Sequence, residues 1–165
     1  MVEIYFMKIK NASVNGRALI KKIAAEKLNT SEESLVFSEN INGKPYFTNF
    51  PDFHFNISHS EDGIAIAVDT KEIGIDIEKI RNVNLRVADR FFTDEEKKYV
   101  YEDMEFCQKR FFEIWTKKEA YIKKNGLKLA DLRSAKSENI YTISHENFII
   151  SVCGEFDCAP VLIKV

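Results

Sequence analysis

The chain has 165 residues, of which 45% are hydrophobic, 12% aromatic and 30% charged. This length suits one domain with room for a hydrophobic core, so we expect a single domain over residues 1–165. The formal net charge is −2, from 24 basic and 26 acidic side chains. This charge excludes the broad basic surface of a typical nucleic-acid-binding protein, but it leaves room for a local basic pocket that takes a small anion.

The sequence also predicts the compartment. No run approaches the roughly 18 apolar residues of a membrane-spanning helix. The opening MVEIYFMKIK lacks the basic start and the long apolar run of a signal peptide. The three cysteines are an odd number without metal-ligand spacing, which is typical of reduced thiols inside a cell. We therefore expect a soluble, cytoplasmic protein that binds neither membranes nor nucleic acid.

The first fifty residues predict a strand, a helix, and a short strand followed by a turn. VEIYFMKI (2–9) alternates as a strand does, and NGRALIKKIAAEKLN (15–29) has apolar residues at helical spacing behind Asn15, a suitable N-cap. LVFS (35–38) is short and strand-like, and NGKPYF (42–47) has the composition of a turn. These elements would open a mixed α and β domain.

Three strands should follow, namely HFNIS (54–58), GIAIAV (63–68) and IGIDIE (73–78). The residues between them have the length of hairpin turns, so we expect an antiparallel meander. The hydrophobic period then becomes helical. Thr93 and Glu96 form a capping-box pattern, which places a helix start at Thr93.

The strongest helix prediction is FCQKRFFEIWTKKEAYIKKNG (106–126). This stretch is long, contains no proline and stops at Asn125 and Gly126. The tail of the chain then returns to strand-like segments, which are NIYTIS (139–144), FIISVCG (148–154) and PVLIKV (160–165).

Two stretches of the chain are alike. ISHSEDGIAIAV, from Ile57, recurs loosely as ISHENFIISVC, from Ile143, and each would be a strand, a turn and a second strand. The likeness has two explanations that the residues leave open: chance, because hairpins share composition, or an internal duplication. A duplication would give two similar α/β halves packed face to face, with a site in the cleft between them.

Asp76 and Glu78 lie one residue apart in an otherwise apolar stretch. On a strand they point to the same side, and two neighbouring carboxylates repel each other unless a cation neutralises them. A hard divalent ion, most simply Mg²⁺, would do so and would complete its coordination with water and substrate phosphates. For these two acids alone, a solvated edge strand is the simpler interpretation.

Glu119 and Lys123 lie four residues apart on one face of the long predicted helix. A single pair of this kind is most often a surface ion pair of small energy. Here Phe111 and Trp115 continue the same stripe, which brings the acid from an apolar face toward a cleft. This placement suits a third metal ligand beside a phosphate-binding lysine.

Basic and hydroxyl groups of the first half would complete an anion site. Lys44 precedes a proline in a rigid turn, and Ser58 and His59 lie at the end of a strand. Arg17 lies near a helix N-terminus, whose dipole attracts anions. Each has an ordinary explanation by itself: a surface lysine, a capping serine, a structural histidine, a solvent-exposed arginine. Together with the three acids they suggest a metal-assisted pyrophosphate site.

Five motifs together resemble a known family. GKP, FNISHS, GIDIE, FFTDEE and WTKKEAYIKKNG, in this order and spacing, resemble the 4'-phosphopantetheinyl transferases of the surfactin-synthetase-activating (Sfp) type, over roughly residues 15 to 155. The resemblance implies an α+β fold, a pseudo-dimer of two similar α/β halves of about 1–70 and 71–165. Each half would be a small antiparallel sheet packed with a long helix, with the active site in the cleft between them. Only 54 residues precede FNISHS, fewer than in most members, so some nucleotide contacts would be missing.

The resemblance also implies roles for individual residues. Three acids would be the ligands of Mg²⁺, or of Mn²⁺ in its place: Asp76, Glu78 and Glu119. Five residues would contact coenzyme A, in part through its 3'-phosphate, which Lys44 and His59 would bind: Arg17, Lys44, Ser58, His59 and Lys123. Three residues would be catalytic: Glu119, Lys123 and Glu96. Lys123 would contact the pyrophosphate and help the leaving group, and Glu96 would lie near the outer shell of the metal.

Similar enzymes transfer the 4'-phosphopantetheine arm of coenzyme A to a serine of an apo acyl or peptidyl carrier protein and release 3',5'-ADP. The resemblance leaves the general base open between Glu119 and a water held by the metal and Glu96. Two other interpretations also stay open: a different metal-dependent phosphotransferase, and a non-catalytic module that binds coenzyme A or carrier domains. We expect a monomer, because one pseudo-dimeric chain already builds the cleft.

The carrier protein would dock on the stretch after Glu78, RNVNLRVADRFF (81–92). Its basic residues would meet acidic helix residues of the carrier, and its apolar residues would add contact area. The residues concerned are Arg81, Leu85, Arg86, Val87 and Arg90. A plain amphipathic helix is an equally good interpretation of this stretch. In the second of the two similar stretches, His145 should be structural.

Overall fold

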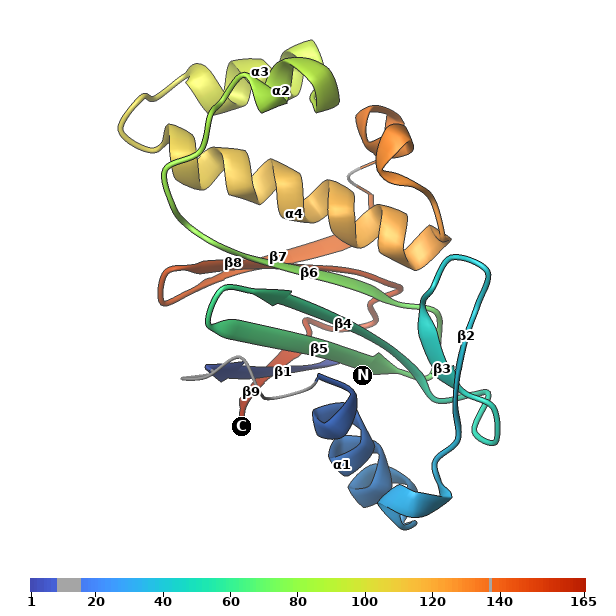
Figure 1. The fold of residues 1–165 in the computed structure, drawn as a ribbon. Coiled ribbons are helices and arrows are strands. Elements are labelled where there is room, and N and C mark those ends of the chain that lie inside the picture. Colours follow the sequence, from blue (N-terminus) through green and yellow to red (C-terminus); the bar gives the residue numbers. More distant parts are fainter. Residues whose placement is uncertain (9–15, 137) are drawn as a thin grey trace.

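The computed structural model describes residues 1–8, 16–136 and 138–165 (Figure 1). Two sheets lie face to face at the centre, one covered by α4 and the other by α1. The helices are α1 (Gly16–Leu28), α2 (Val87–Phe91), α3 (Asp94–Tyr101) and α4 (Cys107–Asn125), with the short 3-10 turns η1 (Glu32–Ser34) and η2 (Leu129–Ser134). Within the described ranges, no helix is both long enough and apolar enough to cross a membrane.

The first sheet has the strand order β4-β5-β1-β9. Its strands are β1 (Glu3–Lys8), β4 (His54–Ser60), β5 (Gly63–Asp69) and β9 (Val161–Lys164). β5 runs antiparallel to both of its neighbours, so that Ile66 lies opposite Ile57 on one side and Tyr5 on the other. β9 pairs parallel with β1, and the last strand of the chain thus joins the sheet of the first half.

The second sheet has the order β6-β8-β7 and is antiparallel throughout. Its strands are β6 (Gly74–Lys79), β7 (Ile140–His145) and β8 (Phe148–Cys153), while β2 (Phe37–Glu39) and β3 (Pro45–Phe47) pair separately. The predicted meander is therefore wrong for its third strand. β4 and β5 form the expected hairpin, but β4 and β1 fill both edges of β5, so β6 pairs with β8 instead.

The two halves repeat one arrangement. In each, a strand is followed by helical structure and then by a hairpin, and the first strand pairs with the second strand of that hairpin: β1 with β5, and β6 with β8. The similar stretches from Ile57 and Ile143 form these hairpins, and both turns begin with a left-handed glutamate, Glu61 (φ 48°) and Glu146 (φ 53°). This is the predicted pseudo-dimer, although the crossing of β9 means that the sheets do not divide at residue 70.

Apolar side chains from alternate strand positions fill the space between the sheets. Ile4 and Phe6 of β1 belong to the same buried cluster as Ile75 and Ile77 of β6 and Phe148 of β8. The outer face of the first sheet packs on the apolar face of α1, and a further cluster joins α4 to α2 and α3. Because Ile75 and Ile77 face this core, the residues between and after them face the other way.

Local signals predicted the later helices well. The Thr93 side chain accepts from the Glu96 amide and the Glu96 side chain accepts from the Thr93 amide, which is the expected capping box at the start of α3. α4 ends at Asn125, and Gly126 follows in the left-handed region at φ 62°. The predicted N-cap, Asn15, lies outside the described residues.

Candidate active site

A pocket of about 350 Å³ lies between the two halves, where β4 and β6 meet α4. It brings together six of the predicted site residues, namely Ser58, His59, Asp76, Glu78, Glu119 and Lys123. The remaining wall comes from Ile57 and Trp115. Hydroxyl and imidazole groups thus come from the first half, and the carboxylates and the ammonium come from the second.

A glycine lets α4 lie directly on β6. A Cβ atom at Gly74 would stand 2.2 Å from the carbonyl oxygen of Ala120 and 2.4 Å from the amide nitrogen of Lys124. Both are backbone atoms, which cannot rotate away, so a larger residue would push the helix off the strand. The two contacted residues follow Glu119 and Lys123 directly in the chain, so this close approach sets the distance of both side chains from β6.

Asp76 is buried beside the lysine of α4. Its Oδ1 accepts hydrogen bonds from Lys123 Nζ at 2.6 Å and from Ser58 Oγ at 2.8 Å. Its Oδ2 is buried and has no hydrogen-bond partner among the described residues. Burial raises the pKa of Asp76, and the Lys123 ammonium and the Ser58 hydroxyl oppose that rise. An unpartnered buried carboxylate oxygen calls for a further partner, such as an ion.

Glu78 is likewise held by a single oxygen. Its Oε2 accepts from Ser60 Oγ at 2.7 Å and from Arg81 Nη1 at 2.8 Å. Arg81, which the sequence placed on a docking surface, thus uses one of its donors inside the chain. Both of these donors meet the same carboxylate oxygen of Glu78.

Glu119 extends from α4 into the same pocket as the two strand acids. Burial raises the pKa of Glu119 to about 7; the negative charges of Asp76 and Glu78 add to the rise, and Lys123 opposes it. A carboxyl group with this pKa can hold or accept a proton near neutral pH.

The donor set fits a hard divalent cation. Asp76, Glu78 and Glu119 line one pocket, their charges repel one another, and Asp76 Oδ2 lacks a partner, so a cation would offset the repulsion and satisfy that oxygen. As the side chains lie, no three His, Cys, Asp or Glu residues in the described ranges are grouped closely enough to hold an ion jointly. The Lys123 ammonium is the cation that contacts Asp76 in this arrangement.

A second hollow, of about 240 Å³, continues from the first, because Ile57 and Lys123 line both. Lys44, a predicted coenzyme A contact, lines this second hollow and not the first. Its Nζ donates to Glu72 Oε2 at 2.6 Å and to the carbonyl oxygen of Ile73 at 2.9 Å. The lysine is therefore already held by a carboxylate of its own chain.

Arg17 and His59 differ in their relation to the pocket. His59 is exposed and lines the wall of the carboxylate pocket. Arg17 lies in the first turn of α1 and lines neither hollow; its guanidinium pairs with Glu39 and stands 5.7 Å from the centre of the Phe37 ring. The structure thus brings His59, but not Arg17, to the predicted acids.

Glu96 also lies outside the pocket. Its Oε2 accepts from the Thr93 amide in the capping box, and its Oε1 lies 2.9 Å from Lys118 Nζ. Lys118 is fully buried (0% exposed), and its other neighbours are the carbonyl oxygens of Arg133 and Ala135, each at 3.4 Å. The carboxylate is engaged in holding α3 against α4, and Glu96 does not line the pocket of the three predicted metal ligands.

The predicted docking stretch is only in part a helix, since α2 is short. Arg86 and Arg90 are exposed on it. Leu85 and Val87 are half-buried and pack against the apolar cluster that joins α2, α3 and α4. The apolar contact area expected for a partner is therefore largely used within the chain.

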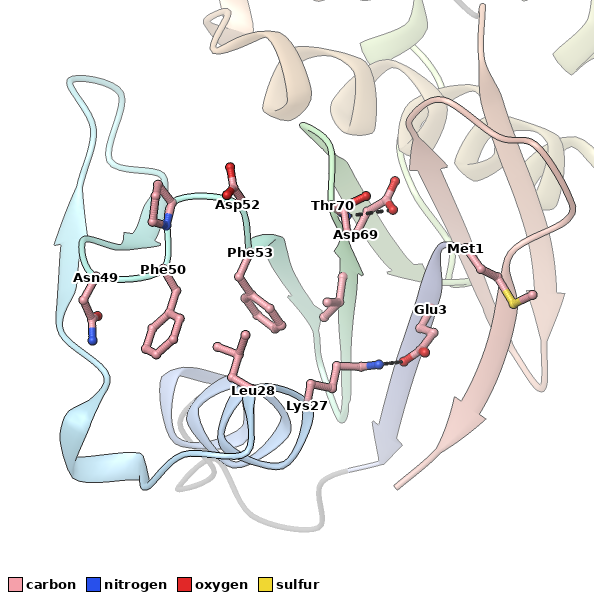
Figure 2. Close-up of a pocket in the computed structure, with 12 residues that line it drawn as sticks. Met1, Glu3, Lys27, Leu28, Asn49, Phe50, Asp52, Phe53, Asp69 and Thr70 are labelled. Atoms are coloured by element: carbon pink, nitrogen blue, oxygen red, sulfur yellow. Dashed lines mark hydrogen bonds and ion pairs between the residues drawn. The ribbon is translucent and has the colours of Figure 1, made fainter.

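A larger cavity, of about 560 Å³, lies between the end of α1, the residues before β4 and the end of β5 (Figure 2). Figure 2 shows Leu28, Phe50 and Phe53 along one side and Lys27, paired with Glu3 at 2.6 Å, along another. No predicted site residue lines this cavity. The chemistry inferred from the sequence needs converging carboxylates, so the smaller pocket is the candidate active site.

Sequence reasoning assigned no role to Ser60 or Lys118. A signal for Ser60 was present, because Ser58 and Ser60 have the same two-residue spacing as Asp76 and Glu78. Lys118 belongs to the motif WTKKEAYIKKNG, but the motif did not indicate its partner, which belongs to a different helix.

Known proteins are similar to this chain over most of its length. Residues 72–164 match the family model of the 4'-phosphopantetheinyl transferase superfamily, and residues 2–71 match the model of the 4'-phosphopantetheinyl transferase N-terminal region. The chain is 38% identical over 126 residues to the 4'-phosphopantetheinyl transferase gsp of Aneurinibacillus migulanus. It is 41% identical over 112 residues to the 4'-phosphopantetheinyl transferase psf-1 of Bacillus pumilus.

These two matches cover 74% and 67% of this chain but 52% and 48% of the relatives, so the chain spans about half the length of the curated relatives it matches. It is also 28% identical over 142 residues to the L-aminoadipate-semialdehyde dehydrogenase-phosphopantetheinyl transferase of Homo sapiens, a match that covers 77% of this chain and 46% of the human protein. Because the first family model covers more than half of the residues, the chain belongs to the 4'-phosphopantetheinyl transferase superfamily.

Proposed function

We propose that the protein transfers the 4'-phosphopantetheine arm of coenzyme A to a serine of an apo acyl or peptidyl carrier protein and releases 3',5'-ADP. The proposal rests on one observation: three acids and a lysine of the second half line a single pocket with a histidine of the first half. Membership of the family supports it. A non-catalytic binding module is disfavoured, because binding alone does not need three mutually repelling carboxylates beside a lysine.

In the proposed reaction, the serine hydroxyl of the carrier attacks the β-phosphorus of coenzyme A. The bond from that phosphorus to the bridging oxygen breaks, and its electron pair leaves with 3',5'-ADP. Glu119 is the proposed acceptor of the serine proton, because it lines the pocket beside Lys123. Lys123 would exchange its contact with Asp76 for one with the departing phosphate and stabilise its charge.

Asp76, Glu78 and Glu119 would hold Mg²⁺, with Mn²⁺ as an alternative ion. The bound ion would supply positive charge beside the diphosphate during in-line transfer. Glu96 has no part in this proposal, because its carboxylate is engaged by Lys118 and by the Thr93 amide.

The second hollow would take the nucleotide part of coenzyme A. Lys44 would reach the 3'-phosphate after leaving Glu72, and His59 would approach the same phosphate from the first pocket. Arg17 is the weaker candidate, because it lines neither hollow. We further propose that the protein acts in the cytoplasm as a monomer, since one chain supplies every residue of this proposal.

Intact-mass spectrometry tests the function directly. An apo carrier protein incubated with the enzyme, coenzyme A and Mg²⁺ should gain the mass of one phosphopantetheine group. A carrier whose acceptor serine is replaced by alanine should gain nothing, and neither Asp76→Ala nor Glu119→Ala should modify the carrier while their circular dichroism stays that of the wild type. No gain on any acyl or peptidyl carrier would refute the proposal, and turnover of another nucleotide without a carrier would favour a different phosphotransferase.

A further inference from the structure

β4 and β6 are joined by side chains and not by a backbone ladder, since they belong to different sheets. Three alternate residues of β4, from Asn56 to Ser60, turn buried polar side chains toward β6, and each accepts a hydrogen bond from a backbone N–H group there. The rungs join Asn56 Oδ1 to Ile75 N (2.9 Å), Ser58 Oγ to Ile77 N (3.4 Å) and Ser60 Oγ to Lys79 N (3.2 Å).

The two serines also make a second contact that the asparagine does not make. A hydroxyl group that accepts a hydrogen bond still has its own proton to donate. Ser58 donates to Asp76 Oδ1 at 2.8 Å, and Ser60 donates to Glu78 Oε2 at 2.7 Å. Each serine oxygen therefore connects a backbone amide of β6 to a carboxylate of the same strand. Asn56 bonds to a backbone amide of β6 but to neither of these carboxylates.

Asp76 and Glu78 receive their hydrogen bonds in the same way. The protein donors to Asp76, from Ser58 and Lys123, both meet Oδ1 and leave Oδ2 without a described partner. The donors to Glu78, from Ser60 and an arginine, both meet Oε2. Each carboxylate is thus held by these donors through one of its two oxygens. Hydrogen-bond partners of this kind orient metal-binding carboxylates, and their loss typically weakens metal affinity by about 10–100-fold.

We propose that Ser58 and Ser60 are positioning residues that orient Asp76 and Glu78 for the divalent cation, an inference that rests on the proposed function. Ser58 donates its one proton to Asp76 and accepts from Lys123 and from a backbone amide, which uses its full hydrogen-bonding capacity. Ser60 is the cleaner test, because it does not line the pocket and has no contact with Lys123.

The test measures the binding of Mn²⁺ to the intact protein, from the electron paramagnetic resonance signal of the free ion. We expect Ser60→Ala to bind Mn²⁺ about 10–100-fold more weakly than the wild type. Ser60→Thr keeps the hydroxyl group and should bind Mn²⁺ as the wild type does. Asn56→Ala is the matched control: it removes a rung of the same kind without touching an acid, so it should lower the urea midpoint of unfolding but leave the Mn²⁺ affinity unchanged.

Transfer kinetics supply a second measurement. Ser60→Ala should need more Mg²⁺ for half-maximal transfer, and excess Mg²⁺ should restore most of the rate, which a general loss of packing would not allow. If Ser60→Ala does not fold, Ser60→Cys replaces it as the weak donor of similar size, and it should bind Mn²⁺ more weakly than Ser60→Thr.

Two results would overturn the inference: equal Mn²⁺ affinity in the wild type and Ser60→Ala, or an equal loss of affinity in Asn56→Ala. Either would mean that the rungs act only on strand packing. A wild-type protein that neither binds Mn²⁺ nor modifies a carrier would refute the proposed function itself. Wild-type transfer together with an unchanged metal affinity in Ser60→Ala would refute the positioning role alone.

Discussion

Glu96→Gln should destabilise the protein strongly, although it replaces a single oxygen atom. The ammonium of Lys118 is fully buried 2.9 Å from this carboxylate, and its other neighbours are two carbonyl oxygens at 3.4 Å. Without the carboxylate charge a buried cation has no counter-ion, which costs about 3–5 kcal/mol. Domains of this kind are stable by about 5–15 kcal/mol, so the free energy of unfolding should fall by a large fraction. Glutamine can still accept from the Thr93 amide, so the capping box does not explain the loss.

The double variant Glu96→Gln/Lys118→Met isolates the ion pair. It removes both charges at similar volume, a change that is often neutral, so it should recover most of the stability that Glu96→Gln loses. Urea unfolding gives the free energies, followed by far-UV circular dichroism and by the fluorescence of the single tryptophan, Trp115. The reasoning is refuted if Glu96→Gln costs less than about 1 kcal/mol, well below the range for a broken buried pair. It is equally refuted if the double variant is no more stable than the single one.

The same double variant tests the catalytic role predicted for Glu96. If this carboxylate only holds α3 against α4, the folded double variant should modify a carrier protein at a rate close to that of the wild type. If the double variant folds but has no transfer activity, Glu96 has a catalytic role and not only a structural one.

Three further changes have expected outcomes. Glu72→Gln should free Lys44 and lower the dissociation constant of coenzyme A by up to about fivefold, the effect expected for loss of a weak exposed ion pair. Calorimetric titration should show no such gain in affinity for coenzyme A that lacks its 3'-phosphate. An equal gain in affinity for both ligands would contradict the phosphate contact. Arg86→Glu should raise the Michaelis constant for the carrier more than that for coenzyme A, because acidic carriers would be repelled. Equal effects on the two Michaelis constants would show that Arg86 does not contact the carrier. Gly74→Ala should lower the melting temperature far more than Gly154→Ala. The new Cβ atom would stand 2.2 Å from helix backbone at Gly74, but 3.2 Å from the movable ring of Phe156 at Gly154. Similar shifts in melting temperature would show that the helix moves away easily.

Features with a local cause could be predicted from the sequence. The capping box of α3 joins residues three apart, and the end of α4 depends on a glycine that tolerates a left-handed backbone. The shared face of Asp76 and Glu78 follows from the alternation of a strand, and the shared face of Glu119 and Lys123 from the period of a helix. All four carboxylate and ammonium side chains that line the pocket could be identified from the sequence in this way.

Features that depend on long-range pairing could not be predicted. The sequence placed β6 beside β5 because a short connection favours a hairpin, but β1, far away in the chain, already occupies that edge. Glu96 was assigned by its motif, and its ion pair with Lys118 is fixed only by the packing of two helices. Lys44 was assigned to an anion, and the structure adds a competing carboxylate, Glu72, which lies in a distant turn.

The parallel pairing of β9 with β1 has a consequence for folding during synthesis. Residues 161–164 leave the ribosome long after residues 3–6, with which they pair. Until then the N-terminal strand has one open edge, on which another nascent chain can add a strand. Contacts of such high sequence separation also slow folding, so completion of the first sheet, and not formation of the helices, should limit the rate at which the native protein appears.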